Sequence, residues 1–325
     1  MRRLAVVAAA ALAASLMAFN AAAEEFPTKI VRLIVPYPAG GGVDNLARPL
    51  VERLSQAWKQ TVIIENKPGA STIVGSKSVA GAPADGYTLL FTTDSTITSN
   101  PFLFKNVGFD PIKELTPITQ LVDLHQFVLA NPAVPARSMK ELVELAKREP
   151  DKLNYGSYGV GSQPHLLFEM LRKETGAQIR QISYRGIAPA VTATLAGDVQ
   201  FTLGSLSVSA GHIDSGKLVP LAISRKERLP GRPAIPTLIE AGYPDIDPRS
   251  WYGLFAPAGT PAAVVEKVQK DVAAILRDPE FKARHIDALG YTGIGSSPAE
   301  FAAFIRQDLS YKEHLITVTG ITAEQ

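Results

Sequence analysis

The sequence predicts an α/β fold in which helices cover a sheet, and two observations carry this prediction. Short runs of apolar and β-branched residues alternate along the chain with segments whose apolar residues recur at helical spacing. Hydrophobic residues make up 46% of the chain and charged residues 20%, which is the composition of a globular protein. Because 325 residues exceed what one hydrophobic core usually serves, we expect two domains.

The first 23 residues have the order of a secretory signal peptide. Two arginines near the start precede an apolar run over residues 4–14, and three alanines ending at Ala23 match a cleavage site. A membrane anchor is the alternative, but the run is short for a span and the acidic pair Glu24-Glu25 follows at once. We therefore expect residues 1–23 to be removed and the mature chain to be exported.

Charge and cysteine content exclude several classes of function. The formal net charge is +2, and loss of the two arginines of the signal leaves the mature chain close to neutral. A chain without a basic excess has no footprint for nucleic acid, so we expect no nucleic-acid partner. Because the chain has no cysteine, it uses neither disulfides nor thiolate chemistry, and its stability must come from its core.

The predicted elements follow in order along the chain. The runs predicted as strands are Ile30–Val35, Thr61–Glu65, Tyr87–Thr92, Phe127–Ala130, Leu153–Gly156, Ile179–Ser183, Val199–Leu203 and Leu218–Ser224. Helices are expected between these strands and over residues 264–276 and 298–309, where apolar residues recur at helical spacing.

The helix expected after the first strand contains two features of its own. Apolar residues recur on one face from Val43 to Trp58, which predicts a helix there. Pro49 lacks an N–H and presses on the carbonyl four residues back, so we expect a kink at that position. Asp44 and Arg48 are four residues apart, and we interpret them as a surface ion pair worth about 0.3–0.5 kcal/mol.

Three consecutive glycines, Gly40-Gly41-Gly42, lie where the first predicted strand ends and this helix begins. Free backbone N–H groups and the helix dipole favour an anion at such a point, and glycine lets a ligand approach the backbone closely. Taken alone, the motif fits a tight turn equally well, because it matches neither a dinucleotide fingerprint nor a P-loop.

The same junction of strand, glycine-containing loop and helix recurs along the chain. It returns in PGASTIVGSKSV (68–79), NYGSYGVGSQPH (154–165) and YRGIAPAV (184–191). In open α/β sheets, ligands bind at the carboxyl ends of the strands. Two early and two central junctions therefore predict two lobes that face a shared ligand cleft.

Several of these motifs resemble one known family. VPYPAGGG, GASTIVG, PADGYTLL, NYGSYGVGSQPHL, YRGIAPA, IPTLIEAGYP and WYGLFAPAGTP occur in this order over essentially the whole mature chain. Together they resemble the Bug-type substrate-binding proteins of tripartite tricarboxylate transporters. The resemblance implies a type II periplasmic-binding-protein fold, with two α/β lobes joined by two crossing strands. The lobes are expected at residues 24–125 plus 252–325 and at residues 126–251.

The resemblance also implies a function. It implies a periplasmic protein that binds a small carboxylate and delivers it to membrane permease subunits, with no cofactor; we expect a monomer. In this family the carboxylate is held mainly by backbone and hydroxyl groups of the junction loops. The matching residues here are Tyr37, Ala39, Gly40, Gly41, Ser71, Thr72, Thr92, Asp94 and Ser95 in the first lobe, and Ser157, Gly159, Gly161, Ser162, His165, Tyr184 and Gly186 in the second.

The chain departs from the family pattern at positions that bear on the ligand. Members usually have glycine where Ser71 and Thr72 stand, and threonine at Val43. Many carry an aspartate at the position of Gly204, so the resemblance implies a ligand without an obligatory ammonium group. Asp94 is the one substitute partner for such a group.

Other interpretations of the same residues remain open. His165 either caps the start of its helix or contacts ligand; metal binding is not expected, because no second histidine lies three or four residues away. A hydrolase using Ser157 and His165 is the alternative function. However, Gly156-Ser157-Tyr158-Gly159 places the serine one position too early for a nucleophile elbow. We therefore expect a binding protein without catalytic residues, and we expect Trp251 to pack between the lobes.

Overall fold

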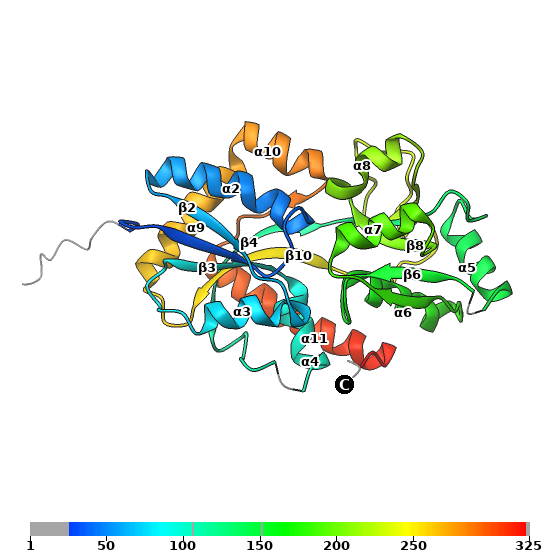
Figure 1. Cartoon of the computed structure of the whole chain (residues 1–325), viewed down its shortest axis with the longest axis horizontal. Helices are drawn as coiled ribbons and strands as arrows, with labels where there is room; N and C mark the ends of the chain where they lie inside the picture. Colours follow the sequence, from blue (N-terminus) through cyan, green and yellow to red (C-terminus); the bar gives the residue numbers. More distant parts are fainter. Residues whose placement is uncertain (1–25, 106, 151, 323–325) are drawn as a thin grey trace, which may run out of the picture.

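The protein folds into two α/β lobes that lie side by side, each built on its own sheet (Figure 1). The structure is a computed structural model that describes residues 26–105, 107–150 and 152–322. The predicted signal segment lies outside these residues. Within the described ranges, no helix is both long enough and apolar enough to cross a membrane.

The first lobe is built on a six-stranded mixed sheet. In sheet order its strands are β11 (Thr292–Gly293), β4 (Leu115–Leu124), β10 (Ser250–Pro257), β3 (Thr88–Thr93), β1 (Val31–Val35) and β2 (Val62–Asn66). β1 is parallel to both β2 and β3, whereas β10 is antiparallel to β3 and β4. The carboxyl ends of β1, β2 and β3 therefore meet at one edge of the sheet.

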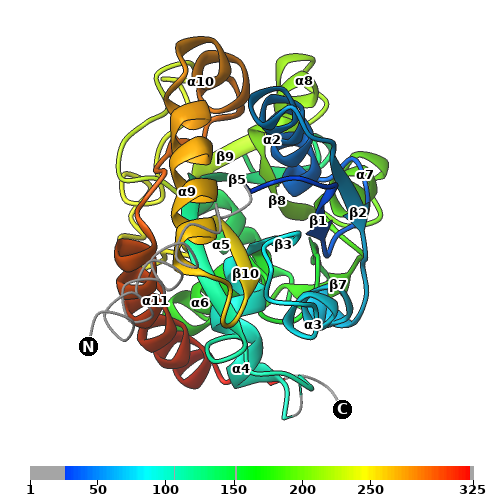
Figure 2. The ribbon, with the colours of Figure 1, turned by 90° about the vertical axis from the view of Figure 1, so that its left-hand side faces the viewer.

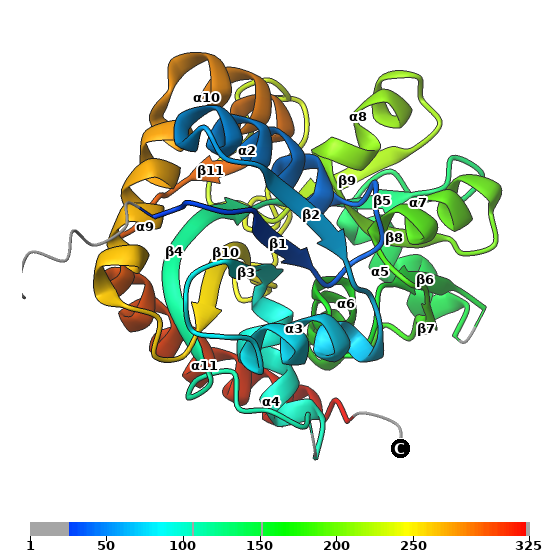
Figure 3. The same ribbon diagram turned by 60° about the vertical axis from the view of Figure 1, so that its left-hand side comes forward.

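Helices cover both faces of this sheet, which is why its parallel strands are almost continuously apolar. One face packs against α2 (Gly42–Trp58), α9 (Ala262–Arg277) and α10 (Pro279–His285), and the other against α3 (Ile73–Ala80) and α11 (Pro298–Thr319). Figures 2 and 3 show these two groups on either side of the strands. Helix α2 continues through Pro49 from Gly42 to Trp58 without interruption.

Short helical segments occupy three connections of the first lobe. They are η2 (Ala70–Thr72), η4 (Asp287–Leu289), and the π-helical turn η3 (Ser95–Ser99), which continues into α4 (Asn100–Leu103). η2 leads into α3, and η3 follows β3 directly. Both therefore lie at the edge where the parallel strands end.

The second lobe contains a five-stranded sheet. In sheet order its strands are β7 (Arg180–Ser183), β6 (Asn154–Ser157), β8 (Phe201–Ser205), β5 (Gln126–Ala130) and β9 (Val219–Ile223). β6 is parallel to β7 and β8, and β5 is antiparallel to β8 and β9. One face packs against α5 (Met139–Arg148) and α6 (Gln163–Thr175), the other against α7 (Ile187–Ala196) and α8 (Leu206–Asp214).

The chain passes between the sheets at two places. It leaves the first sheet at the end of β4 and enters the second at the start of β5, and His125 is the single residue between these strands. It re-enters the first sheet with β10, which begins at Ser250. Nδ1 of His125 lies 3.1 Å from the Ser224 carbonyl oxygen and Nε2 lies 3.0 Å from Thr292 Oγ1, so its ring contacts both lobes. The exact division into residues 24–125 plus 252–325 and 126–251 stays a prediction.

Candidate functional site

A cavity of about 590 Å³ lies between the two lobes. Its walls come from the loop after β1 and the last residue of β3 in the first lobe, and from the loops after β6 and β7 and from helix α7 in the second. The first residues of β5 and β10, Gln126 and Ser250, complete the lining at the crossings. The cavity is therefore bounded by the carboxyl ends of parallel strands from both sheets, where an open α/β sheet binds its ligands.

The structure brings together five of the residues predicted from the sequence. They are Tyr37, Ala39, Gly41, Tyr184 and Gly186, all of which line this cavity. Tyr37 and Tyr184 supply an aromatic wall from each lobe, and the hydroxyl of Tyr37 lies 2.7 Å from Thr93 Oγ1. Gly41 and Gly186 immediately precede α2 and α7, so both helices begin at the cavity.

The glycine run places the start of α2 close to Tyr252 of β10. Gly41 is in an extended conformation, with φ −79° and ψ 175°, and a Cβ there would have Pro38 O as its nearest neighbour at 3.6 Å. A Cβ on Gly42 would lie only 2.7 Å from the Tyr252 hydroxyl oxygen. Glycine is therefore required at position 42 for close approach, whereas position 41 has room for a side chain.

Three more predicted residues line an adjoining cavity of about 580 Å³. They are Ser71, Thr72 and Gly159. The two cavities share Tyr37, Pro38, Tyr158, Tyr184, Arg185 and Gly186 in their walls. Ser71 and Thr72 adopt positive φ values of 50° and 79°, which explains why glycine suits these positions.

The remaining predicted residues line neither cavity, and their contact with ligand stays a prediction. They are Gly40, Thr92, Asp94, Ser95, Ser157, Gly161, Ser162 and His165. Their polar groups are mostly engaged within the protein. Thr92 Oγ1 lies 2.6 Å from Thr96 Oγ1, and Ser162 Oγ donates to the Gly159 carbonyl at 2.6 Å.

His165 caps the loop in front of its own helix. Its Nδ1 accepts a hydrogen bond from the Gly161 N–H at 3.1 Å, and burial lowers the pKa of the imidazole to about 4. Ser157 Oγ accepts a hydrogen bond from Gln181 Nε2 at 2.7 Å. Each side chain is thus committed to another partner, and no hydrogen bond joins Ser157 to His165 in the described part of the chain.

Asp44 is buried, which corrects its interpretation as half of a surface ion pair. Its side chain is 2% exposed, and Oδ2 accepts hydrogen bonds from Arg48 Nε at 2.7 Å and the Gly40 N–H at 2.9 Å. Oδ1 accepts from Asn66 Nδ2 at 3.2 Å. Burial opposes ionisation, but these hydrogen bonds together hold the pKa of Asp44 below its ordinary value. Asp44 therefore fixes the glycine loop against the end of β2.

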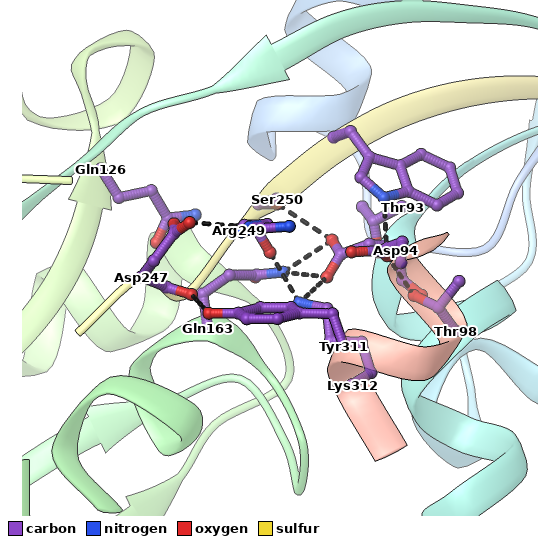
Figure 4. A network of polar contacts seen from close by, with 12 residues as sticks. Thr93, Asp94, Thr98, Gln126, Gln163, Asp247, Arg249, Ser250, Tyr311 and Lys312 are labelled. Atoms are coloured by element: carbon purple, nitrogen blue, oxygen red, sulfur yellow. Dashed lines mark hydrogen bonds and ion pairs between the residues drawn. The ribbon is translucent and has the colours of Figure 1, made fainter. Parts of the chain in front are cut away.

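Asp94 lies behind the cavity wall in a buried polar network (Figure 4). Its carboxylate accepts hydrogen bonds from Gln163 Nε2 at 2.7 and 2.9 Å and from Ser250 Oγ at 3.0 Å. Lys312 Nζ, from α11, lies 2.9 Å away, and both charged side chains are fully buried. Burial raises the pKa of the Asp94 carboxyl, and the charge of Lys312 opposes that shift. Asp94 is therefore already paired and not open to a ligand ammonium group.

Several residues that line the cavity were missed by reasoning from the sequence. They include Gln126, Tyr158, Gln163, Arg185 and Ser250. Arg185 is the only basic residue of the lining in the described chain, and its side chain forms no ion pair there. Tyr158, Gln163 and Arg185 lie inside motifs that the sequence analysis singled out, so position along a junction loop was the available signal. Gln126 and Ser250 had none beyond their nearness to the crossings.

The electrostatic character of the cavity follows from these parts. The N-termini of α2 and α7 enter it from opposite lobes, and their first N–H groups have no acceptor within the helix. The helix dipoles and the Arg185 guanidinium favour a negative charge. Among the described residues, Asp198 is the one acidic residue of the lining. The arrangement suits a small anion that both lobes contact.

The comparison with known families identifies the kind of protein. The family model for the tripartite tricarboxylate transporter family receptor matches residues 46–321. The chain belongs to this family. Two relatives from Bordetella pertussis extend the match to almost the whole chain. One, a UPF0065 protein, is 34% identical over 96% of this chain and 96% of its own, and the other, BugT, is 30% identical over 98% of each.

Solved structures that are similar to this chain have the same two-lobed fold. The periplasmic binding protein BugD is 33% identical, with a TM-score of 0.85 over 91% of this chain and 99% of its own. The Rhodopseudomonas palustris protein Rpa4515, solved with adipate, is 30% identical with a TM-score of 0.88 over 92% and 99%. MatC from the same species, with bound malate, is 27% identical with a TM-score of 0.84 over 90% and 100%. The predicted fold class and family are confirmed.

Proposed function

We propose that this periplasmic solute-binding protein captures a small carboxylate between its lobes and delivers it to the permease subunits of a tripartite tricarboxylate transporter. One observation carries the proposal. The N-termini of two helices, α2 and α7, enter a single cavity from opposite lobes, beside the Arg185 guanidinium, which forms no ion pair among the described residues. Backbone N–H groups at a helix start, with a nearby cation, are donors suited to a carboxylate.

Capture follows from the division of these donors between the lobes. A carboxylate bound by both sets of donors bridges the lobes, and closing around it removes water from the cavity. Hydrogen bonds strengthen in the less polar surroundings, so bound ligand favours the closed arrangement. The paired β4–β5 and β10 crossings supply the connections about which such closure would occur.

The relatives support a carboxylate as the ligand. Rpa4515 was solved with adipate and MatC with malate, and both have this fold. We infer that an ammonium group is not obligatory: Asp94 is occupied by Lys312, Gln163 and Ser250, which leaves Asp198 as the acidic side chain of the described lining that could pair with one. An unpaired ammonium in a closed cavity would cost several kcal/mol.

The ligand-binding residues that we propose are those that line the two adjoining cavities. From the sequence prediction these are Tyr37, Ala39, Gly41, Ser71, Thr72, Gly159, Tyr184 and Gly186. We add Arg185, from the same loop as Tyr184 and Gly186. Turnover of the ligand is not expected, because Ser157 and His165 each have a different hydrogen-bond partner.

The experiment that tests the proposal begins with the protein as purified. Mass spectrometry of small molecules released by denaturation would identify a bound carboxylate, and calorimetric titration of the emptied protein would give its affinity. The expected result is one site per chain with no change in the ligand after incubation. Failure to recover or titrate any carboxylate would contradict the proposal, and conversion of the ligand would favour an enzyme.

Export and delivery have tests of their own. We propose that the mature protein begins at Glu24, after removal of residues 1–23. Intact-mass analysis of periplasmic material should give the mass of this shorter chain, and a retained Met1 would contradict the proposal. Delivery to permease subunits is tested by ligand uptake in cells. Deleting the gene for this chain should abolish high-affinity uptake, whereas unchanged uptake would contradict a transport role.

A further inference from the structure

We propose that the cavity is built to accept a hydrogen bond from its ligand, so that the bound carboxylate also carries a hydroxyl or N–H group. This inference rests on the proposed function and concerns the side chains that line the same cavity. It depends on a chain of hydrogen bonds that runs from Asp94 through Gln163 and Tyr158 to Gln126. The direction of each bond in that chain is set by the one before it.

This series of hydrogen bonds starts at Asp94, a carboxylate that can only accept hydrogen bonds. The Asp94 carboxylate is fully buried beside Lys312, and all its contacts come from donors (Figure 4). Gln163 Nε2 lies 2.7 and 2.9 Å from the two carboxylate oxygens. A carboxylate cannot donate to an amide oxygen, so the amide nitrogen of Gln163 must face Asp94. The amide oxygen of Gln163 is therefore turned to the other side.

The next bond uses the only proton of a phenol. Tyr158 OH donates to Gln163 Oε1, and burial together with the charge of Asp94 raises the pKa of this phenol well above its ordinary value. The hydroxyl consequently keeps its proton and has no second one to give. Gln126 Nε2, 2.9 Å from the same oxygen, is therefore the donor in the next bond.

Two acceptors remain at the cavity wall. Gln126 Oε1 lies 3.2 Å from the Tyr158 hydroxyl oxygen but receives no proton from it, because that proton is committed to Gln163. Ser250 Oγ donates its own proton to Asp94 and keeps its lone pairs. Gln126 and Ser250 are 5% and 7% exposed and line the cavity. Water reaches them poorly, so a ligand that fills the cavity must supply the donor or leave them unpaired.

The cavity thus offers donors and acceptors from different elements. The starts of α2 and α7 and the Arg185 guanidinium are donors for a carboxylate. Gln126 at the start of β5 and Ser250 at the start of β10 are acceptors for a hydroxyl or N–H group. A site that pairs with a hydroxyl discriminates against the analogue that lacks it, because its own buried polar groups are then left unpaired.

The test compares pairs of acids that differ by one hydroxyl group. Suitable pairs are malate and succinate, 2-hydroxyglutarate and glutarate, 6-hydroxyhexanoate and hexanoate, and 4-hydroxybenzoate and benzoate. Calorimetric titration of the emptied protein should show the hydroxylated member of a binding pair to be about 10- to 100-fold tighter. Equal or tighter binding of the unhydroxylated members would overturn the inference while leaving the proposed carboxylate site intact.

Two variants test the hydrogen-bond chain itself. Gln163→Met releases the Tyr158 proton toward Gln126 Oε1, and Tyr158→Phe frees the Gln126 amide to turn either way. Each should reduce the ratio of affinities within a pair to about twofold or less, whatever its effect on absolute affinity. Gln181→Met is the matched control, because it removes an amide donor to Ser157 Oγ outside both cavities and should keep the wild-type ratio. A wild-type ratio in the folded Gln163 and Tyr158 variants would overturn the inference.

The native ligand gives an independent answer if no pair binds. A recovered carboxylate that lacks every hydroxyl and N–H group would overturn the inference but not the proposed function. A recovered carboxylate that carries such a group would support it. Absence of any carboxylate, both from the purified protein and in titration, would overturn the proposed function and this inference with it.

Discussion

At the scale of single residues, the site depends on side chains that never reach the ligand cavity. Asp44 and Asp94 are both buried carboxylates, and each holds a loop at the cavity edge. Asp44 fixes the Gly40 N–H, and Asp94 fixes the amide of Gln163. A sequence pattern can mark both residues as acidic, but it does not show that their partners lie in other elements.

The start of α2 can be tested by adding a charge at the glycine loop. Gly41→Asp should abolish carboxylate binding, because it places a negative charge among donors that are arranged for an anion. The backbone angles and the space at position 41 permit the side chain, so the variant should remain folded. Gly211→Asp is the control: it adds the same charge on α8, where nothing lies within 4 Å of the new Cβ. Undiminished affinity in calorimetric titration of folded Gly41→Asp would show that the loop is only a turn.

Removing the charge of Asp44 should destabilise the protein in a pH-dependent way. The folded-state pKa of Asp44 lies below its ordinary value, so its contribution is present above about pH 4 and is lost as pH falls through the folded pKa. Asp44→Asn should lower the free energy of unfolding at pH 7 by about 1–3 kcal/mol. Urea titrations should show this difference shrinking at pH 3. As a control, Asp287→Asn removes a charge from an exposed ion pair and should change the free energy of unfolding at pH 7 by less than about 1 kcal/mol. An equal loss of stability in both variants would contradict the role given to Asp44.

At the scale of elements, the sequence predicted the regular parts well and failed where polar residues lie inside. All the runs predicted as strands are strands, with their ends shifted slightly. β4 was missed because LTPITQLVDL mixes polar residues and a proline into a strand whose residues are mostly buried. The helix expected over residues 298–309 extends to Thr319. Its inward face continues with Asp308 and Lys312, and two charged residues interrupt the apolar spacing on which the prediction depended.

The sequence predicted which loops form the candidate site, but not which residues of those loops line the cavity. The glycine junctions located the loops, because helix starts at strand ends follow from local sequence, and the family resemblance indicated Tyr37, Gly41, Tyr184 and Gly186 within them. Which residues of a loop face the cavity depends on packing across the lobes. Asp94 was predicted to meet ligand, yet it binds Lys312 from a helix more than 200 positions further along the chain.

The anchoring of α11 gives a prediction about stability. Lys312→Met removes the buried ammonium that faces Asp94 and leaves the carboxylate without its cation. The expected loss is about 3–5 kcal/mol in the free energy of unfolding, measured by urea titration. The double variant Asp94→Asn with Lys312→Met removes both charges of the pair, so it should recover part of that loss. A double variant as unstable as the sum of the two single changes would contradict a direct pairing.

At the scale of the whole molecule, two histidines connect fold stability to pH. Burial lowers the pKa of His165 to about 4, and burial with the nearby Arg225 charge lowers that of His125 to about 4. His125 lies at the crossing between the sheets, with ring contacts to both lobes. Protonating either ring in the folded protein is therefore unfavourable compared with protonating it in the unfolded chain.

The sign of the pH effect follows from these pKa values. Between about pH 6.5 and pH 4 the unfolded chain binds protons that the folded protein does not, so stability falls as pH decreases. His165 alone should account for about 2 kcal/mol between pH 7 and pH 5. His165→Gln keeps an acceptor for the Gly161 N–H but does not titrate, so its urea stability should depend less on pH by that amount. A variant with the wild-type pH dependence would refute the assignment.

The buried carboxylate of Asp94 also constrains how this protein can change over evolutionary time. Its Oδ2 binds the cation that anchors α11, and both of its oxygens bind the amide of Gln163 at the cavity wall. A substitution at Asp94 that alters the affinity for ligand must therefore also alter how firmly α11 is held. Selection for a new nutrient and selection for a durable fold act on the same atoms here, so adaptation of specificity is expected to proceed first through Gln126 and Tyr158, which do not contact the ion pair.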